Sequence, residues 1–196
     1  MIPALAEVVE GLPVRVVQAD AMDADWAAML GEGAWRMASN LPYNVAVPVL
    51  LRLLQEAPAV DPLIVMVQRE VGERLAAGPG EEAFGAVSLK VAYRASVRVA
   101  RRVAPTVFWP EPKVESVVLR IERHPAPVET PEPELFRLIE AGFAQRRKAM
   151  NSALVRLGLE RPAAIEALRR AGLGERVRAE TLGLDDFARL AEELRG

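Results

Sequence analysis

The segment Ser39–Leu50, SNLPYNVAVPVL, places an amide, a proline and a phenol side by side in an otherwise apolar stretch. The Asn40 carboxamide oxygen and the adjacent Leu41 carbonyl can both accept hydrogen bonds from one NH₂ group. Pro42 restricts Leu41 to extended conformations, which holds that carbonyl in place. Tyr43 adds a flat face on which a base can stack. Two acceptors beside one aromatic face predict a pocket for an exocyclic aromatic amine such as the N6 of adenine.

The chemistry of such an amine explains why acceptors are needed. Its nitrogen is a poor nucleophile, because the lone pair is delocalised into the ring. Hydrogen bonds from its two protons to carbonyl oxygens favour the charge that builds on nitrogen as it attacks an electrophile. A strong general base is then unnecessary, and the segment contains none. The residues alone also allow a plain turn in which Asn40 acts as a cap.

Hydrophobic periodicity predicts the elements that position this segment. A β-branched run over 14–20 predicts a buried strand that ends at Asp20, and a second strand is expected over 34–40. Asn40 then lies at the carboxyl end of a strand, where open α/β sheets bind ligands. The other predicted elements are helices over 23–33, 45–57, 69–78 and 84–95 and strands over 62–68, 96–104 and 113–123. We expect a mostly parallel sheet with helices on both faces, and the last two strands antiparallel near an edge.

The segment 124–134, HPAPVETPEPE, holds four prolines and three glutamates and predicts a linker. Beyond it, four stretches with helical spacing are separated by Gly or Pro. The expected fold class is therefore α/β followed by a small all-α domain. Residues 1–125 form the first domain of this prediction, and residues 132–196 form the helical second domain.

Composition sets further bounds on function. Of the 196 residues, 51% are apolar and 27% are charged, as expected for a soluble globular protein without a membrane span. There is no Cys, which excludes disulfides and thiolate metal sites. The only histidine, His124, lies in a loop-like context, and we expect no metal site. The N-terminus lacks the features of a signal peptide, so we expect a cytoplasmic protein.

The net charge of −2 conceals an uneven distribution. Residues 1–93 contain 6 basic and 12 acidic side chains, residues 94–123 contain 7 and 3, and residues 137–178 contain 10 and 4. An acidic first half and basic later segments indicate a polyanionic partner on one side, although arginine-rich helices are also common as solvated faces.

Six stretches together resemble a known family. NLPY at 40–43 resembles the signature of amino-methyltransferases, and VQAD at 17–20 resembles their strand that ends beside the methyl donor. The other stretches resemble blocks of the KsgA-type ribosomal RNA adenine N6,N6-dimethyltransferases. They are VQREVGERLAAGPGEEAFGAVSLKVAYRA at 67–95, FWPEPKVESVVLRI at 108–121, FAQRRKAMNSAL at 143–154 and RAETLGLDDFARLA at 178–191. The resemblance covers nearly the whole chain from Val14 onward.

This resemblance implies a class I, Rossmann-like methyltransferase that uses S-adenosyl-L-methionine. It places Asp20 and Ala21 beside the adenine of the methyl donor, with Asn40 also near the donor. It assigns the target N6 to Asn40 and the Leu41 carbonyl, with Pro42 stiffening the loop. Tyr43 and Phe108 would sandwich a base turned out of its stack. The basic residues Arg146, Arg147 and Lys148 would share one helical turn and contact RNA phosphates.

The chain departs from the family pattern at the methyl-donor site. Neither the Gly-rich turn after the first strand nor the ribose-binding acid after the second is present, since the first 13 residues hold only Gly11. By family order the chain begins near the second helix, and we expect an N-terminally truncated sheet with exposed apolar edges. As given, we expect the chain to bind the methyl donor weakly or not at all.

The function implied by the resemblance is dimethylation of adenine N6 in small-subunit (16S) rRNA by a monomer whose partner is the small ribosomal subunit. Two alternatives stay open. One is a large-subunit rRNA adenine N6-methyltransferase of the macrolide-resistance type, which shares the NLPY and FxPxP features. The other is a non-catalytic RNA-binding module, because the Gly-rich donor loop is absent.

Overall fold

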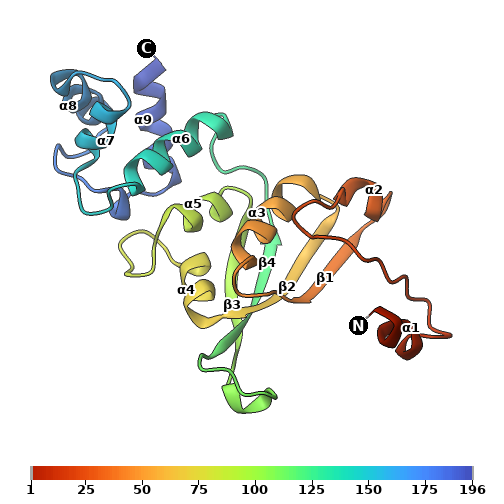
Figure 1. Ribbon diagram of the computed structural model, residues 1–196. Coiled ribbons are helices and arrows are strands. Elements are labelled where there is room, and N and C mark those ends of the chain that lie inside the picture. The colour runs from red at the N-terminus through yellow and green to blue at the C-terminus, as the bar shows by residue number, and fades with distance from the viewer. Residues whose placement is uncertain (1, 196) are drawn as a thin grey trace.

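The computed structural model describes residues 2–195, which are built around a four-stranded sheet in the order β1-β2-β4-β3 (Figure 1). The strands are β1 (Trp35–Asn40), β2 (Val60–Gln68), β3 (Ala95–Val103) and β4 (Ser116–Arg123). β1 and β2 pair in parallel, whereas β4 is antiparallel to both β2 and β3. The antiparallel last strands, with β3 at an edge, are therefore confirmed. The prediction of a mostly parallel sheet is wrong for these four strands.

One face of the sheet is covered by helices α3 (Ala46–Glu56), α4 (Arg69–Ala76) and α5 (Ala86–Ala92). Alternate residues of β2 and β4 point into the apolar cluster beneath these helices, and six of these are buried: Leu63, Val65, Val67, Val117, Leu119 and Ile121. Ile64 and Met66, on the other face of β2, lie outside both apolar clusters of residues 2–195 and are partly exposed. The prediction of helices on both faces is thus wrong for the described residues.

α4 packs especially closely on the sheet at Gly72. A Cβ atom at Gly72 would lie 2.2 Å from Cγ2 of Val117 on β4. Only glycine allows this approach, because Val117 is buried and β-branched and has little room to move. The contact fixes α4 against the strand that supports the candidate site.

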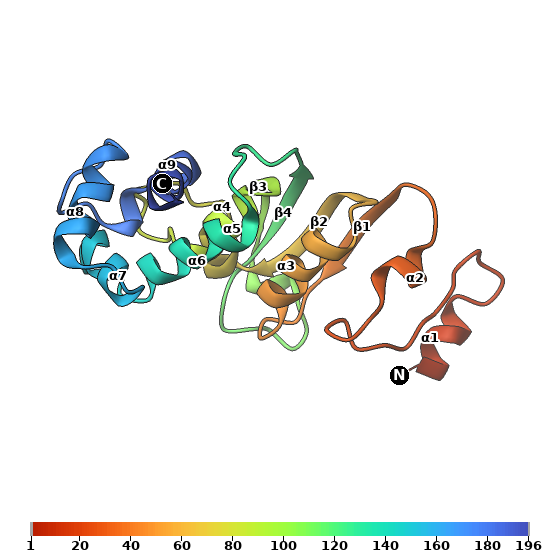
Figure 2. The ribbon, with the colours of Figure 1, turned by 90° about the horizontal axis from the view of Figure 1, so that it is seen from above.

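The C-terminal part is a bundle of α6 (Glu132–Phe143), α7 (Met150–Arg156), α8 (Arg161–Arg170) and α9 (Leu184–Arg195). Figure 2 shows this bundle at one end of the molecule, with the sheet in the middle. Its apolar core also takes in Phe84 and Leu89, which precede the linker. The ion pair Lys90–Glu140 joins α5 to α6, and Arg94, just after α5, pairs with Glu132 of α6. The bundle thus shares a core with residues before the linker, and the domain boundary between 125 and 132 stays a prediction.

The N-terminal segment contains two short helices, α1 (Ile2–Val8) and α2 (Trp26–Leu30). α1 has no buried residue and lies apart from the rest of the chain (Figure 2). The predicted strand over 14–20 is wrong, because these residues form no strand and Val14 and Val17 are exposed. A strand needs a neighbour for its hydrogen bonds, and none lies beside this run in residues 2–195. None of the described helices is long and apolar enough to cross a membrane.

Candidate functional site

The turn between β1 and α3 carries the Asn40–Tyr43 segment. β1 ends at Asn40, and the Leu41 amide then donates to the Met66 carbonyl of β2 at 3.1 Å. The Val45 amide donates to the Pro42 carbonyl at 3.2 Å, which closes the turn just before α3 begins at Ala46. The segment therefore lies at the carboxyl ends of two parallel strands, as the sequence predicts.

A cleft of about 340 Å³ opens at this turn. One wall is Asn40, Leu41, Pro42 and Tyr43, and the other belongs to the loop between β3 and β4: Phe108, Trp109, Pro110 and Pro112. The structure thus brings two segments more than sixty residues apart in sequence around one cavity. Its volume is at the small end of the range for ligand sites and accommodates a nucleobase.

Tyr43 is anchored to the sheet by its hydroxyl. The Tyr43 Oη atom lies 3.3 Å from Oγ of Ser116, the first residue of β4, and Ser116 is only 1% exposed. Tyr43 itself is 38% exposed, so its hydroxyl is held while part of the residue meets solvent. Sequence reasoning missed this role of Ser116. The sequence feature that could have indicated it is that Ser116 lies in the same FWPEPKVES block as Phe108.

The two acceptors at the cleft are free to bind a ligand. Within residues 2–195, no hydrogen bond is found for the Asn40 carboxamide or for the Leu41 carbonyl. The Leu41 residue is 6% exposed, and its position is set by the amide bond to β2. A fixed, unpaired carbonyl at the edge of a cavity is a strong acceptor for an N–H donor.

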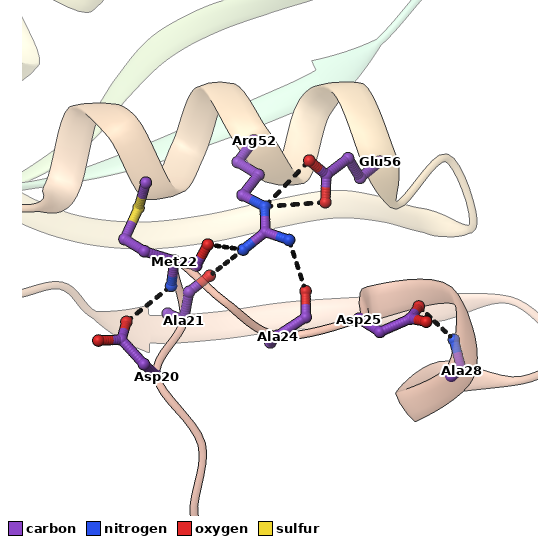
Figure 3. A network of polar contacts seen from close by, with 8 residues as sticks. All are labelled: Asp20, Ala21, Met22, Ala24, Asp25, Ala28, Arg52 and Glu56. Atoms are coloured by element: carbon purple, nitrogen blue, oxygen red, sulfur yellow. Dashed lines mark hydrogen bonds and ion pairs between the residues drawn. The ribbon is translucent and has the colours of Figure 1, made fainter.

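A second polar cluster, shown in Figure 3, surrounds the turn that follows Asp20. Oδ1 of Asp20 accepts from the Met22 amide at 2.8 Å. Arg52 of α3 donates to the carbonyls of Ala21 at 3.3 Å and Ala24 at 2.8 Å, and also to that of Met22. One side chain thus holds the turn against α3.

Arg52 is itself oriented by its own helix. Its Nε donates to both carboxylate oxygens of Glu56, at 2.9 and 2.8 Å, and this hydrogen bond raises the pKa of Arg52. Oδ2 of Asp20 has no hydrogen bond within the described chain. Asp20 and Ala21 do not line the cleft that Asn40 and Tyr43 line. Ala21 is thus bonded to α3 and Asn40–Tyr43 lead into α3, whereas Phe108 comes to the cleft from the loop between β3 and β4.

The three basic residues predicted for RNA binding do not share a helical turn. Arg146, Arg147 and Lys148 lie in the turn between α6 and α7, because α6 ends at Phe143 and α7 begins at Met150. Arg146 pairs with Glu180 at 2.9 Å and donates to the Glu82 carbonyl at 2.7 Å. It thereby connects the bundle to the loop before α5. Arg147 and Lys148 are exposed and form no ion pair within residues 2–195.

Comparison with known proteins decides the family. The family model described as ribosomal RNA adenine dimethylase matches residues 1–195. The chain belongs to this ribosomal RNA adenine dimethylase family. The resemblance carried by the NLPY, FWPEPKVES and QRRK stretches is thereby confirmed.

Curated relatives in the adenine dimethylase family carry the name ribosomal RNA small subunit methyltransferase A. The protein from Thermobifida fusca is 47% identical over 180 residues, which cover 91% of this chain and 62% of the relative. The one from Kineococcus radiotolerans is 46% identical over 182 residues, with coverages of 92% and 60%. The chain thus spans about three fifths of the length of these relatives.

Solved structures confirm the expected fold class. The chain is similar to a dimethyladenosine transferase from Plasmodium falciparum, with a TM-score of 0.76, 19% identity and coverage of 99% of this chain and 77% of that one. It is also similar to the 23S rRNA methyltransferase ErmE, with a TM-score of 0.70, 21% identity and coverages of 99% and 78%. The described chain therefore has the Rossmann-like methyltransferase fold of these proteins.

Proposed function

We propose that the protein transfers two methyl groups from S-adenosyl-L-methionine to the N6 of adenine in small-subunit rRNA. The observation that carries the proposal is the cleft between Tyr43 and Phe108, with two unpaired acceptors at Asn40 and Leu41. The names of the relatives at 46–47% identity support the choice of rRNA. The proposal includes the small ribosomal subunit as partner, a monomeric enzyme and a cytoplasmic location.

The cleft suits a base that has been turned out of its stack. The adenine ring lies between the Tyr43 and Phe108 rings, and its amine donates one proton to the Asn40 carboxamide oxygen and the other to the Leu41 carbonyl. These acceptors stabilise the positive charge that develops on N6 as it attacks the methyl carbon. Most of the rate enhancement then comes from holding the two reactants in line. The transfer would break the sulfur–methyl bond of the donor, leave a neutral thioether and release one N6 proton to solvent. The remaining N6 proton can then be held by either acceptor.

The residues of the Asp20 turn fit one end of the methyl donor. Oδ2 of Asp20 is free to accept from the exocyclic amine of the donor's adenine, while Oδ1 is occupied by the Met22 amide. Ala21 lies next to it in the turn that Arg52 holds. When bound, S-adenosylmethionine supplies an electrophilic methyl group on a sulfonium. The residues of this chain contribute the acceptor and the fixed turn.

The RNA partner is expected to contact exposed basic side chains. Arg147 and Lys148 are exposed and unpaired within residues 2–195, so they are available for phosphates. Arg146 serves instead to hold the bundle against the loop before α5, through Glu180 and the Glu82 carbonyl. We therefore propose phosphate binding for Arg147 and Lys148 and a positioning role for Arg146.

Deletion of the gene tests this function in the cell. We expect N6,N6-dimethyladenosine to disappear from small-subunit rRNA nucleosides measured by mass spectrometry, and the unaltered gene to restore it. A gene copy with Asn40→Ala should fail to restore it, although the protein accumulates to the same level.

The same measurement separates the alternatives. Loss of a methylated adenosine from large-subunit rRNA alone would support the macrolide-resistance type of enzyme. Unchanged methylation of both rRNAs, together with defective assembly of the small subunit, would support a non-catalytic RNA-binding module.

A further inference from the structure

Trp109 is the most exposed large apolar residue of the described chain, at 96% exposure. It lies in the loop between β3 and β4, directly after Phe108, and it lines the same cleft as Tyr43. Single exposed apolar residues are common and need no explanation. An indole that is almost fully exposed at the rim of a cavity with aromatic walls is different, because it offers a second stacking surface beside the first.

The surroundings of Trp109 favour a nucleic acid over a protein as the occupant. β3 is an edge strand that leads toward the loop, and its Arg101 and Arg102 are exposed. Neither arginine forms an ion pair with another residue in the range 2–195. Arg101 and Arg102 pair in register with Val118 and Val117 and so lie on opposite faces of the sheet, but both add unneutralised positive charge to the strand that leads into the loop. Positive charge on this strand and an exposed aromatic ring in the loop suit a strand of nucleic acid, which offers both phosphates and bases. In the loop itself, Lys113 and Glu111 offset each other.

We infer that Trp109 stacks on the nucleotide next to the target base, while the positive charge of β3 attracts the phosphates of the bound strand. This inference rests on the proposed function and assigns a second nucleotide subsite to the same cleft. Phe108 and Tyr43 hold the extruded base, and Trp109 holds its neighbour. The two subsites share one loop, so binding of the neighbour also fixes the Phe108 wall.

Fluorescence anisotropy with a 5′-labelled short oligoadenylate tests the inference on the full chain. Trp109→Ala should weaken binding by about tenfold, as expected for the loss of one base–aromatic stack. Trp109→Phe should keep most of the affinity because it keeps a ring. Trp35→Ala is the matched control, since Trp35 is also exposed, at 39%, but lies on β1 outside the cleft. Its effect should be negligible.

Adenosine monophosphate provides the second arm, because a single nucleotide cannot occupy the target-base subsite and the Trp109 subsite at once. Its affinity should be unchanged by Trp109→Ala and reduced by Tyr43→Ala. If oligoadenylate binding depends on Tyr43 but not on Trp109, the inference is wrong and the proposed function stands. If the unaltered chain binds neither probe, both are overturned. Circular dichroism of each variant checks that the fold is retained.

Discussion

The two groups of site residues are held in different ways. The target-base side, Leu41 and Tyr43, is attached to the sheet through the Met66 carbonyl and the buried Ser116 hydroxyl. The proposed donor side, the turn after Asp20, is exposed at Met22 and Asp23 but buried at Ala24, and the guanidinium of Arg52 holds it to α3. The first is hydrogen-bonded to the strands of the sheet, whereas the second is held by one arginine side chain and by the packing of Ala21 and Ala24.

This difference indicates that the two parts of the site differ in rigidity. The proposed methyl transfer requires a closely aligned target base, and the proposed acceptors lie at the end of β1 and directly after it. We expect a turn held mainly by one arginine to open at a lower free energy than the core of the sheet. Perturbing the sheet should therefore destabilise the whole fold, whereas perturbing Arg52 should change the turn alone.

The largest effect is expected from Gly72→Ala, which disturbs the sheet side. The new Cβ atom would meet Val117 at 2.2 Å, so the variant should lose about 1–3 kcal/mol of the free energy of unfolding. Urea denaturation followed by circular dichroism measures it. Gly174→Ala is the control, because a Cβ atom there would have no neighbour within 4 Å and the φ of Gly174 is not positive. Equal losses in both variants would show that the close approach of α4 does not matter.

A smaller and local effect is expected from Arg52→Ala. Loss of the bonds to the Ala21 and Ala24 carbonyls should raise hydrogen exchange of the Met22–Ala24 amides by about tenfold or more. The Leu41 amide, which is bonded to β2, should keep its exchange rate. Glu56→Gln is the control, since it leaves the carbonyl contacts of Arg52 in place.

If Arg52→Ala raised the hydrogen exchange of the Leu41 amide as much as that of the Met22–Ala24 amides, the two parts of the site would not be held separately. Such a result would mean that the turn and the β1–α3 connection open together.

A still smaller effect, on nucleotide affinity, is expected when the hydrogen bond between Tyr43 and Ser116 is removed. Ser116→Ala removes a 3.3 Å contact and should weaken adenosine monophosphate binding by about two- to fivefold. Tyr43→Phe should weaken adenosine monophosphate binding by about the same factor. The double variant should weaken it no more than either single variant does. Isothermal titration calorimetry measures all three. If the losses of binding free energy in the two single variants added up in the double variant, the two hydroxyl groups would act independently.

The sequence predicts the placement of Asn40–Tyr43 well for a local reason. Asn40, Pro42 and Tyr43 adjoin one another in a strand-to-helix turn, so their position follows from neighbouring residues. Phe108 joined them only through the family resemblance, since nothing local places a loop beside β1. The helices of the bundle were also predictable, because each repeats its apolar face within a few turns.

The failures of prediction depend on distant partners. Val14 and Val17 favour a strand by type, but strand formation requires a neighbouring strand that sequence periodicity does not reveal. Arg146 was predicted to bind RNA like its basic neighbours, but it forms an ion pair with Glu180 and a hydrogen bond to the Glu82 carbonyl. The carbonyl contacts of Arg52 span about thirty residues and carry no sequence signature.

The smallest effect lies in the bundle, which carries neither side of the site. Hydrogen bonds from Arg169 and Arg170 lower the pKa of Glu166 to about 2 from its usual 4.5. Because the folded-state pKa is lowered, this stabilisation is present above pH 4.5 and is lost as the pH falls through about 2. Glu166→Gln should slightly flatten the dependence of stability on pH in that range, as measured by denaturation at each pH. An unchanged slope would show that the exposed pairs contribute nothing measurable.

The central claim is that Asn40 and Leu41 recognise an exocyclic amine, and nucleotide discrimination by calorimetry tests it most directly. Adenosine monophosphate carries the amine, whereas inosine monophosphate carries a carbonyl at that position and would face the two acceptors without a donor. We predict that the unaltered chain binds adenosine monophosphate about tenfold or more tightly than inosine monophosphate, and that Asn40→Ala removes most of this difference. Equal affinities in the unaltered chain, or a preference that survives Asn40→Ala intact, would contradict the account.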